Sequence, residues 1–464
     1  MSAPIIWIVF PFLLSIGMLF LLKYPRILRT IALGAGLLLT MIALLQPIGN
    51  VINFGRLVLD FRPEMMVLGR SLFLDNADRF SLLMIYSILT IYLLLMDVLK
   101  VPIKFIPLSL AVSALLVTAL AVQPFLYAAV IVELAVLLIV VMVTDKKVDQ
   151  GKGVIRFLVY LTLAMPFILF SGWILGGTFA SPSNASYLIG AAAALFFGFA
   201  IWLAVFPFHA WVAQFSRAVK PYLFGFVFSQ LPIVVLLIIV SYVSSLVWLR
   251  SASYLAPALS TIGIIMIVTT GIQAAVEKDL KRLLGATVLL ETGFALVMIS
   301  LKSDLGVTLL YRSFVPRVIA LALLVFSLSV LETGGVMPSF EGIRGSLRKF
   351  PFASVGVLFS LFSIAGFPLF AAFPVRIELL HQVGTMSVSP LIWMVAGLTG
   401  FIIAVVKTFF FITFPLNGKW TSGEKVSQAI VIIFGVLLLA LLGLIPGLLQ
   451  SFIAPFTEQL PLLR

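Results

Sequence analysis

The sequence predicts an all-α integral membrane protein with about fourteen transmembrane helices, and three observations lead to this prediction. Of the 464 residues, 62% are hydrophobic and only 10% are charged, with a mean hydropathy of +1.24, so there is too little charge to cover a soluble surface. The apolar runs reach the length of about 20 residues that crosses roughly 30 Å of hydrocarbon. Runs such as residues 227–247 do not alternate apolar and polar residues, as the strands of membrane barrels do.

The apolar runs and the breakers between them place the individual spans. They lie at residues 4–22, 28–48, 80–99, 104–121, 124–144, 155–177, 185–206, 219–247, 254–276, 283–301, 306–330, 352–382, 389–415 and 427–452. Residues 50–79 form the one sizeable hydrophilic loop, and no segment is long enough for a soluble domain. We therefore expect one membrane domain over residues 1–464.

Lysine and arginine residues gather in alternate loops. Nineteen follow odd-numbered spans: Lys23, Arg26, Arg29, Lys100, Lys104, Lys146, Lys147, Lys152, Arg156, Arg217, Lys220, Lys278, Lys281, Arg282, Arg344, Arg348, Lys349, Lys419 and Lys425. Six follow even-numbered spans: Arg56, Arg62, Arg70, Arg79, Arg250 and Lys302. By the positive-inside rule, the loops after odd-numbered spans face the cytoplasm. This bias accounts for the net charge of +13 without a nucleic-acid partner, for which the chain has no basic domain.

The composition also argues against resident cofactors. The chain has no cysteine, which excludes disulfides, iron–sulfur clusters and thiolate metal sites. Its two histidines, His209 and His381, are too few to favour a haem or copper centre. We therefore expect no metal, no cofactor and no catalytic centre in this chain, and any redox chemistry belongs to a partner protein.

Two of the predicted spans contain breaks. The seventh span runs into Pro207, and the twelfth contains Gly366-Phe367-Pro368 followed by Pro374. Proline removes a backbone donor and clashes with the preceding turn, so both helices should be interrupted. The breaks lie five spans apart, which predicts two inverted five-helix repeats: spans 4–8 (residues 104–247) and spans 9–13 (residues 254–415). Matched broken helices in inverted repeats are typical of transporters and mark a candidate ion path; simple proline kinks are the alternative.

Four motifs, in order across residues 120 to 380, carry a family resemblance. Pro207-Phe208-His209-Ala210-Trp211 resembles a Pro-x-His-x-Trp signature, and Val132-Glu133-Leu134 resembles a Trp-Glu pair. Residues 278–285 with 291–294 resemble Asp-x-Lys-Arg-Leu-x-Ala…His-x-Gly-Phe, and Gly366-Phe367-Pro368 with Phe373 is similar to Gly-x-Pro…Gly-Phe. The sequence thus resembles the antiporter-like membrane subunits of respiratory complex I, of Mrp-type cation/proton antiporters and of membrane-bound hydrogenases.

The resemblance implies a chain of buried ionisable residues that carries protons or sodium along the bilayer midplane. The family's relay uses a glutamate in span five, lysines or histidines in spans seven, eight, ten and eleven, and a lysine or glutamate in span twelve. The corresponding candidates in this sequence are Glu133, Gln230, Glu291, Arg312, Arg317, Arg376, Glu378, His381 and, in span thirteen, Lys407. Trp202 stands where the span-seven lysine is expected. His209 either lies at a proton access point on the cytoplasmic side or caps the broken helix.

These departures change the expected chemistry. Tryptophan carries no proton, and arginine stays protonated, with a pKa above about 12, so it cannot release and recapture protons as a lysine does. We hypothesise that Glu291 pairs with Arg312 or Arg317, which would replace a titrating histidine by a fixed ion pair. The alternative is that these side chains extend separately to the membrane surfaces. Glu133, a carboxylate inside a span, is expected to have a function more than a structural partner.

The sequence therefore predicts an antiporter-like membrane-arm subunit of a complex I-like (NADH-quinone oxidoreductase type) assembly, whose proton relay is degraded or rerouted. It contributes to proton translocation or supports the assembly, alongside other membrane-arm subunits. The alternatives are a standalone or Mrp-type Na⁺/H⁺ antiporter subunit and a subunit of a membrane-bound hydrogenase complex. The missing span-seven lysine counts against a standalone antiporter. The expected location is a bacterial or archaeal cytoplasmic membrane, or an energy-transducing organelle or thylakoid membrane.

Overall fold

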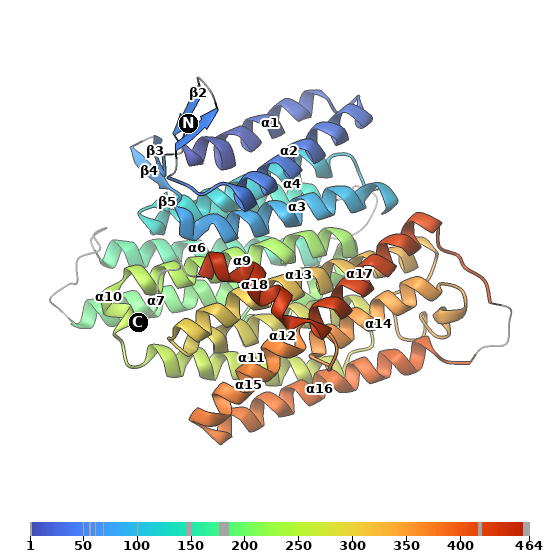
Figure 1. Ribbon diagram of the computed structural model, residues 1–464. Coiled ribbons are helices and arrows are strands. Elements are labelled where there is room, and N and C mark those ends of the chain that lie inside the picture. The colour runs from blue at the N-terminus through green and yellow to red at the C-terminus, as the bar shows by residue number, and fades with distance from the viewer. Residues whose placement is uncertain are drawn as a thin grey trace.

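The computed structural model of the chain describes residues 2–49, 51–54, 57–60, 62–67, 69–99, 101–144, 151–175, 185–415 and 420–457. Five of the charges used to predict the topology (Arg56, Lys100, Lys146, Lys147 and Lys419) and the end of the sixth predicted span lie outside these residues. Over the rest, the fold is a bundle of helices that run roughly side by side, with small strands at one end of the first four helices (Figure 1).

The helices follow the predicted spans closely in the first two thirds of the chain. They are α1 Phe10–Phe20 (extending a short π-helix, Ile5–Val9), α2 Pro25–Leu45, α3 Arg79–Leu99, α4 Phe105–Ala121, α5 Ala128–Val143, α6 Gly151–Ile174, α7 Ala185–Trp202, α8 Ala210–Ala218, α9 Pro221–Ser245, α10 Val247–Arg250, α11 Leu255–Val276, α12 Leu280–Ser300 and α13 Asp304–Thr333. The remainder are α14 Pro351–Ala365, α15 Phe373–Met386, α16 Val388–Ile412, α17 Val426–Leu444 and α18 Pro446–Thr457.

Length and apolar composition identify the helices that can cross a membrane. Ten helices of the described residues meet both conditions, and four shorter apolar helices accompany them: Ile5–Phe20, Phe105–Ala121, Tyr187–Trp202 and Pro351–Ala365. The chain is therefore an integral membrane protein of nearly all-helical fold, as predicted. The number of fourteen spans remains a prediction.

The hydrophilic loop at residues 50–79 contains strands that the sequence analysis did not predict. Strands β1 (Val51–Phe54) and β2 (Leu57–Asp60) form one antiparallel hairpin. Strands β3 (Glu64–Val67) and β4 (Arg70–Phe73) form another, which pairs with β5 (Val122–Gln123) after α4. Gly69, at φ +74°, allows the tight reversal before β4. The long loop is thus anchored to the end of α4.

Burial distinguishes central helices from peripheral ones. The most apolar 18-residue window of α9 is entirely buried, and 89% of the corresponding windows of α12 and α13 is buried, whereas only 17% is buried in α17 and 28% in α11. A helix that is apolar all round and buried all round must lie inside the bundle. The core of the bundle therefore contains α9, α12 and α13.

Three helices are interrupted. Leu203–His209 separate α7 from α8, and Gly366–Ala372 separate α14 from α15, which confirms both predicted breaks. We call these segments the first break and the second break. The last predicted span, 427–452, is not one helix: α17 ends at Leu444 and α18 begins at Pro446. That prediction was wrong because Pro446 cannot donate the backbone hydrogen bond that would continue α17.

Candidate functional site

The two breaks begin with the same backbone structure. In the first, the N–H of Val205 donates to the carbonyl of Ala200 (2.8 Å) and that of Ala204 to Ile201 (3.1 Å). In the second, the N–H of Phe367 donates to Phe362 (3.0 Å) and that of Gly366 to Ser363 (2.9 Å). Both pairs form a Schellman motif, whose left-handed residue is Ala204 (φ +52°) in the first break and Gly366 (φ +73°) in the second.

The first break is surrounded by apolar side chains. Trp202 ends α7 and is only 5% exposed, and the next residues, Leu203 and Val205, are buried as well. His209 is half-buried directly before α8, and its ring stacks on Phe206 with 5.5 Å between centroids. The His209 side chain makes no capping hydrogen bond to α8, so the helix-capping alternative finds no support. Its role in proton access remains a prediction.

Gln230, the candidate in the next helix, is held in structural hydrogen bonds. Its Oε1 accepts from Ser113 Oγ of α4 at 3.1 Å, and its Nε2 donates to the carbonyl of Ile85 in α3 at 3.2 Å. The amide is 1% exposed, and each of its two polar atoms has a hydrogen-bond partner on a neighbouring helix. Gln230 therefore joins α3, α4 and α9 and carries no charge.

Glu133 lies half-buried on α5 at the edge of an exposed apolar face that includes Leu134 and Leu137. Its Oε1 accepts a hydrogen bond from Thr162 Oγ1 of α6 at 2.7 Å, while its Oε2 is buried without a partner. No ion pair to Glu133 occurs within the part of the chain that the structure describes. The Glu133 carboxylate thus has no ion pair among the described residues, but a hydroxyl of α6 donates a hydrogen bond to one of its oxygens.

The second break is built around Arg376, which lies in the first turns of α15 and is 4% exposed. Its Nη2 donates to the carbonyl of Ile364 at 3.0 Å and also to Oε1 of Glu291 on α12. Ile364 lies in the last turn of α14, where carbonyls lack helical partners and the helix dipole is negative. The guanidinium also lies over the Phe294 ring, 3.6 Å from its centroid. Arg376 thus donates hydrogen bonds both to a backbone carbonyl in the last turn of α14 and to the Glu291 carboxylate of α12.

Gly366 is required by this arrangement. Besides its left-handed backbone, a Cβ at this position would lie 3.0 Å from Cγ of Arg376. The absence of a side chain therefore lets Arg376 fold back across the end of α14.

A second ion pair lies about half a turn further along α15. Arg312 Nη1 of α13 is 2.9 Å from Oε2 of Glu378, whose side chain is 38% exposed. Arg317, also on α13, is 4% exposed and forms no hydrogen bond or ion pair with any residue that the structure describes. It is close enough to interact electrostatically with Glu291 and Arg376. The cluster of three arginines and two glutamates therefore has an excess of one positive charge.

The structure corrects the pairing predicted from the sequence. Glu291 forms its ion pair with Arg376, and Arg312 forms its own with Glu378, so neither predicted partner of Glu291 is bonded to it. The predicted partners, Arg312 and Arg317, lie on α13, the next helix in the sequence, but neither contacts Glu291 in an ion pair. The break instead turns the start of α15 back toward α12, which brings Arg376 to Glu291 from 85 residues away.

Two further candidates lie apart from these pairs. His381 is exposed on α15. Lys407 of α16 donates from Nζ to the carbonyl of Glu277 at 2.7 Å and lies over the Phe340 ring at 4.5 Å. Glu277 is the C-terminal cap of α11, so Lys407 interacts with the negative end of that helix. Neither residue joins the cluster at the second break.

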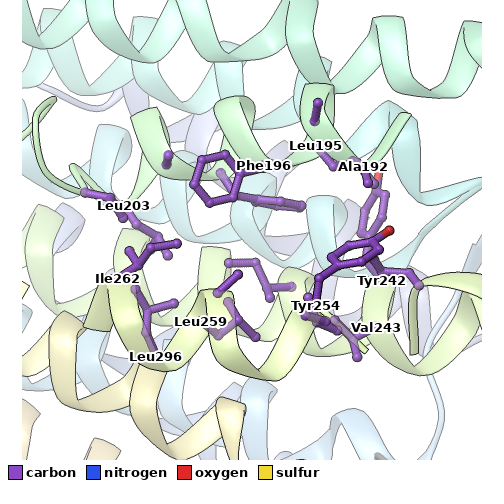
Figure 2. Close-up of a pocket in the computed structure, with 18 of the residues that line it drawn as sticks. Ala192, Leu195, Phe196, Leu203, Tyr242, Val243, Tyr254, Leu259, Ile262 and Leu296 are labelled. Carbon is purple, nitrogen blue, oxygen red and sulfur yellow. The ribbon is translucent and has the colours of Figure 1, made fainter. Parts of the chain in front are cut away.

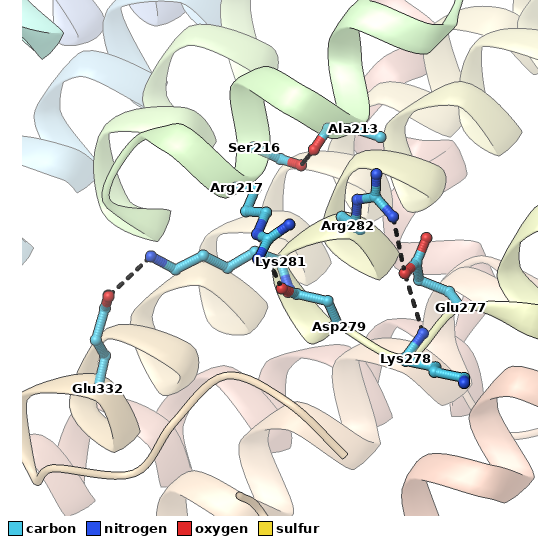
Figure 3. Close-up of polar contacts among 9 residues, drawn as sticks. All are labelled: Ala213, Ser216, Arg217, Glu277, Lys278, Asp279, Lys281, Arg282 and Glu332. Carbon is cyan, nitrogen blue, oxygen red and sulfur yellow. Dashed lines mark hydrogen bonds and ion pairs between the residues drawn. The ribbon is translucent and has the colours of Figure 1, made fainter. Parts of the chain in front are cut away.

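A separate polar group joins the two halves of the molecule, as Figure 3 shows. Arg217, in the last turn of α8, is 3.6 Å from Asp279, which caps the N-terminus of α12. Lys281 is buried and pairs with Glu332 of α13 at 2.8 Å. The sequence analysis used these lysines and arginines as topology signals and, within residues 278–285, as part of a motif, and it predicted no role for Glu332. Lys281 lies two residues after the cap Asp279, and its burial requires an acidic partner.

The residues at both breaks suit the transfer or blocking of charge better than they suit a metal. No group of histidine, aspartate and glutamate side chains that could hold a metal ion occurs among the described residues. Beside Glu291 and Arg376 lies a space of about 10 Å³, which also borders Ser313. This volume is enough for about one water molecule and too small for a continuous water column.

Comparisons with known proteins agree with the resemblance of the motifs. The family described as "NADH:quinone oxidoreductase/Mrp antiporter, TM" matches residues 177–404. A protein of Solidesulfovibrio magneticus named NADH-quinone oxidoreductase subunit N 2 is 25% identical over 281 residues, which cover 57% of this chain and 56% of the relative. NADH-quinone oxidoreductase subunit N of Deinococcus radiodurans is 23% identical over 289 residues, covering 59% and 56%. The chain thus aligns with little more than half the length of these relatives.

Solved structures match over nearly the full chain. A chain of the Mrp complex from Dietzia has a TM-score of 0.85 at 14% identity, covering 99% of this chain and 97% of that one. A chain of an archaeal membrane-bound sulfane sulfur reductase reaches 0.83 at 17% identity, covering 99% and 98%. A chain of respiratory complex I from Thermus thermophilus reaches 0.74 at 17% identity, covering 95% and 97%. At these identities the matches establish a common fold.

Proposed function

The chain belongs to the antiporter-like membrane subunits of the NADH:quinone oxidoreductase and Mrp antiporter family, and we propose that it is a membrane-arm subunit of a complex I-like assembly. Within that assembly it supports proton translocation and does not act as an independent antiporter. Its partners are other membrane subunits, and its location is the cytoplasmic membrane of a bacterium or archaeon. The names of the sequence relatives support the complex I-like assembly in preference to an Mrp-type one.

The observation that carries this proposal is the contrast in charge between the two breaks. The first break offers no titratable group on α7, because Trp202 occupies the end of the helix in apolar surroundings. An antiporter that works alone needs a residue at each step that can bind and release an ion. The missing group leaves a gap between Glu133 and the second half of the chain.

At the second break, charge is present but fixed. The Arg376–Glu291 pair is buried on both sides, with side-chain exposures of 5% and 10%. An arginine stays protonated, and Arg376 is bonded directly to the Glu291 carboxylate. The excess positive charge that Arg317 adds also opposes the passage of a free proton or sodium ion. The cluster is therefore suited to hold α12, α13 and α15 in one arrangement within a larger proton-translocating complex.

Isolation of the native assembly tests this proposal. The chain, tagged and expressed in its own host, is purified in a mild detergent, and its co-purifying subunits are identified by mass spectrometry. Subunits with iron–sulfur centres and no nickel enzyme support the proposal, nickel-containing subunits would assign the chain to a membrane-bound hydrogenase, and isolation of the chain alone contradicts it. A set of Mrp-type cation antiporter subunits without redox proteins would assign the chain to the alternative assembly.

Transport by the isolated chain provides an independent measurement. The purified chain is placed in liposomes with a pH-sensitive dye inside, and a sodium or pH gradient is applied. We expect no exchange above that of protein-free liposomes, because α7 ends at the first break in Trp202, which carries no proton. Sodium-driven proton exchange by the chain alone would contradict the proposed supporting role.

A further inference from the structure

A large cavity lies beside the first break, between α7, α9 and α11 (Figure 2). Its volume is about 470 Å³. Leu203 and Ile262 lie at one end of it and Tyr242 and Tyr254 at the other, as Figure 2 shows. The cavity therefore runs from the start of α11 to the point where α7 ends.

The walls of the cavity are almost entirely hydrocarbon. Among the described lining residues, Tyr242 and Tyr254 are the two with a polar side-chain atom, and the Tyr242 hydroxyl is buried without a partner. Sites for polar ligands present a few well-placed donors, acceptors or charges to orient them. This cavity offers one tyrosine hydroxyl, at its end. Its occupant must therefore be a hydrocarbon chain.

The length of the cavity along α7 is close to half the thickness of the hydrocarbon core of a bilayer. Along α7 its wall extends from Ile189 to Ala200, a rise of about 17 Å at 1.5 Å per residue. Half of a hydrocarbon core of about 30 Å is about 15 Å. These dimensions fit one acyl chain that reaches from the membrane interface to the midplane.

The mouth of the cavity lies on the outer surface of the helix bundle. Ile189 and Phe196 of the apolar helix α7, and Tyr254 directly before α11, line it and are 65%, 43% and 48% exposed. Tyrosine is typical of the membrane–water interface, and Tyr254 lies directly before α11, where a headgroup would remain outside.

We infer that this cavity is a binding site for one acyl chain of a membrane phospholipid. The chain enters beside Tyr254 and extends to Leu203 at the first break. There it fills the space around the end of α7 with hydrocarbon and keeps water from the break. The inference rests on the membrane location of the protein and does not depend on the proposed assembly.

Photo-crosslinking of the full chain in phospholipid vesicles tests the inference. Two phosphatidylcholine probes are used, one with a diazirine at the end of an acyl chain and one with a diazirine next to the ester. We expect the chain-end probe to label Leu203 and Ile262 and the ester-proximal probe to label Tyr254. Labelling of Leu203 and Ile262 by neither probe, or by both equally, would overturn the inference.

Cavity-filling variants test it a second time. In A192F/A258F, two alanines of the wall become phenylalanine, and labelling of Ile262 by the chain-end probe should fall about tenfold, which corresponds to about 1.4 kcal/mol of binding. A396F, at an exposed alanine of α16 that does not line the cavity, is the matched control and should label as the wild type does. Unchanged labelling in a folded A192F/A258F protein contradicts the inference, and should the double variant not fold, the two-probe comparison decides.

A quinone with an isoprenoid tail is the competing occupant. Added in amounts equal to the protein, such a quinone should leave the chain-end labelling unchanged. Loss of labelling under these conditions would assign the cavity to a quinone tail and overturn the acyl-chain site.

Discussion

The first and second breaks begin with the same backbone motif and differ in their contents. Both begin with a Schellman motif, at Ala204 and at Gly366, and each is followed by a further helix, α8 or α15. Ten residues after the left-handed residue, the first break has Gln214 and the second has Arg376. Gln214 accepts a hydrogen bond from Arg156 at an exposed site, whereas Arg376 pairs with buried Glu291.

The two carboxylates at corresponding spans differ in the same way. Glu133 and Glu291 lie in spans five and ten, the second members of the two predicted repeats. Glu133 has a threonine hydroxyl and no ion pair within the described part of the chain, while Glu291 has Arg376. Both breaks interrupt a helix, but of these two carboxylates only Glu291 has an ion pair among the described residues. The matched caps support the proposed repeats at residues 104–247 and 254–415.

The largest expected effect comes from removing the charge at the second break. Arg376→Ala leaves Glu291 unpaired and buried and also uncovers the Ile364 carbonyl, so we expect a loss of about 3–5 kcal/mol in the free energy of unfolding. SDS titration of the detergent-solubilised protein measures it. The control is E291Q/R376Q, which neutralises both partners and should recover most of the loss. An Arg376→Ala protein as stable as the wild type would show that the cluster is not structural.

Introducing a charge at the first break tests the comparison from the other side. Trp202→Lys places an ammonium group in apolar surroundings, and we expect it to unfold about 2.5–3.5 kcal/mol more easily than Trp202→Leu, which loses only the ring. The same SDS titration measures the difference. Equal stability of the two variants would mean that water reaches the first break, against the apolar lining described above.

The caps themselves give a smaller and reciprocal effect. Gly366→Ala forces a left-handed alanine against Arg376 Cγ and should destabilise by about 1–2 kcal/mol, whereas Ala204→Gly relieves a left-handed alanine and should stabilise by up to about that amount. Thermal unfolding midpoints of the two variants provide the measurement. Shifts of the same sign would contradict the equivalence of the two caps.

The smallest effect is expected at Glu133. Because Trp202 at the end of α7 cannot relay a proton onward from α5, Glu133→Gln should change proton pumping by the parent assembly by no more than about twofold. Pumping in membrane vesicles, driven by the assembly's electron donor, provides the measurement, and Thr162→Val, which removes only the hydrogen bond to Glu133, is the control. A loss comparable to that of an uncoupled assembly would show that the path works despite Trp202.

The sequence by itself determined the membrane location, the helical fold and the positions of both breaks. These properties follow from local chemistry: hydrocarbon excludes unpaired backbone groups, and proline removes a backbone donor at Pro207 and in Gly366-Phe367-Pro368. The same local chemistry predicted that α7 ends without a titratable residue, because Trp202 could be read directly. It did not predict the hairpins in residues 51–73, whose short strands depend on pairing with each other and with β5.

Only the tertiary structure decided which charges meet. The second half of the chain has three arginines near Glu291. The predicted partners were Arg312 and Arg317, which lie on the next helix in the sequence. The break after α14 turns Arg376 back over the Ile364 carbonyl and onto α12, while Arg312 reaches Glu378. Ion pairing acts over a few ångströms between residues far apart in the chain, so it depends on how broken helices pack.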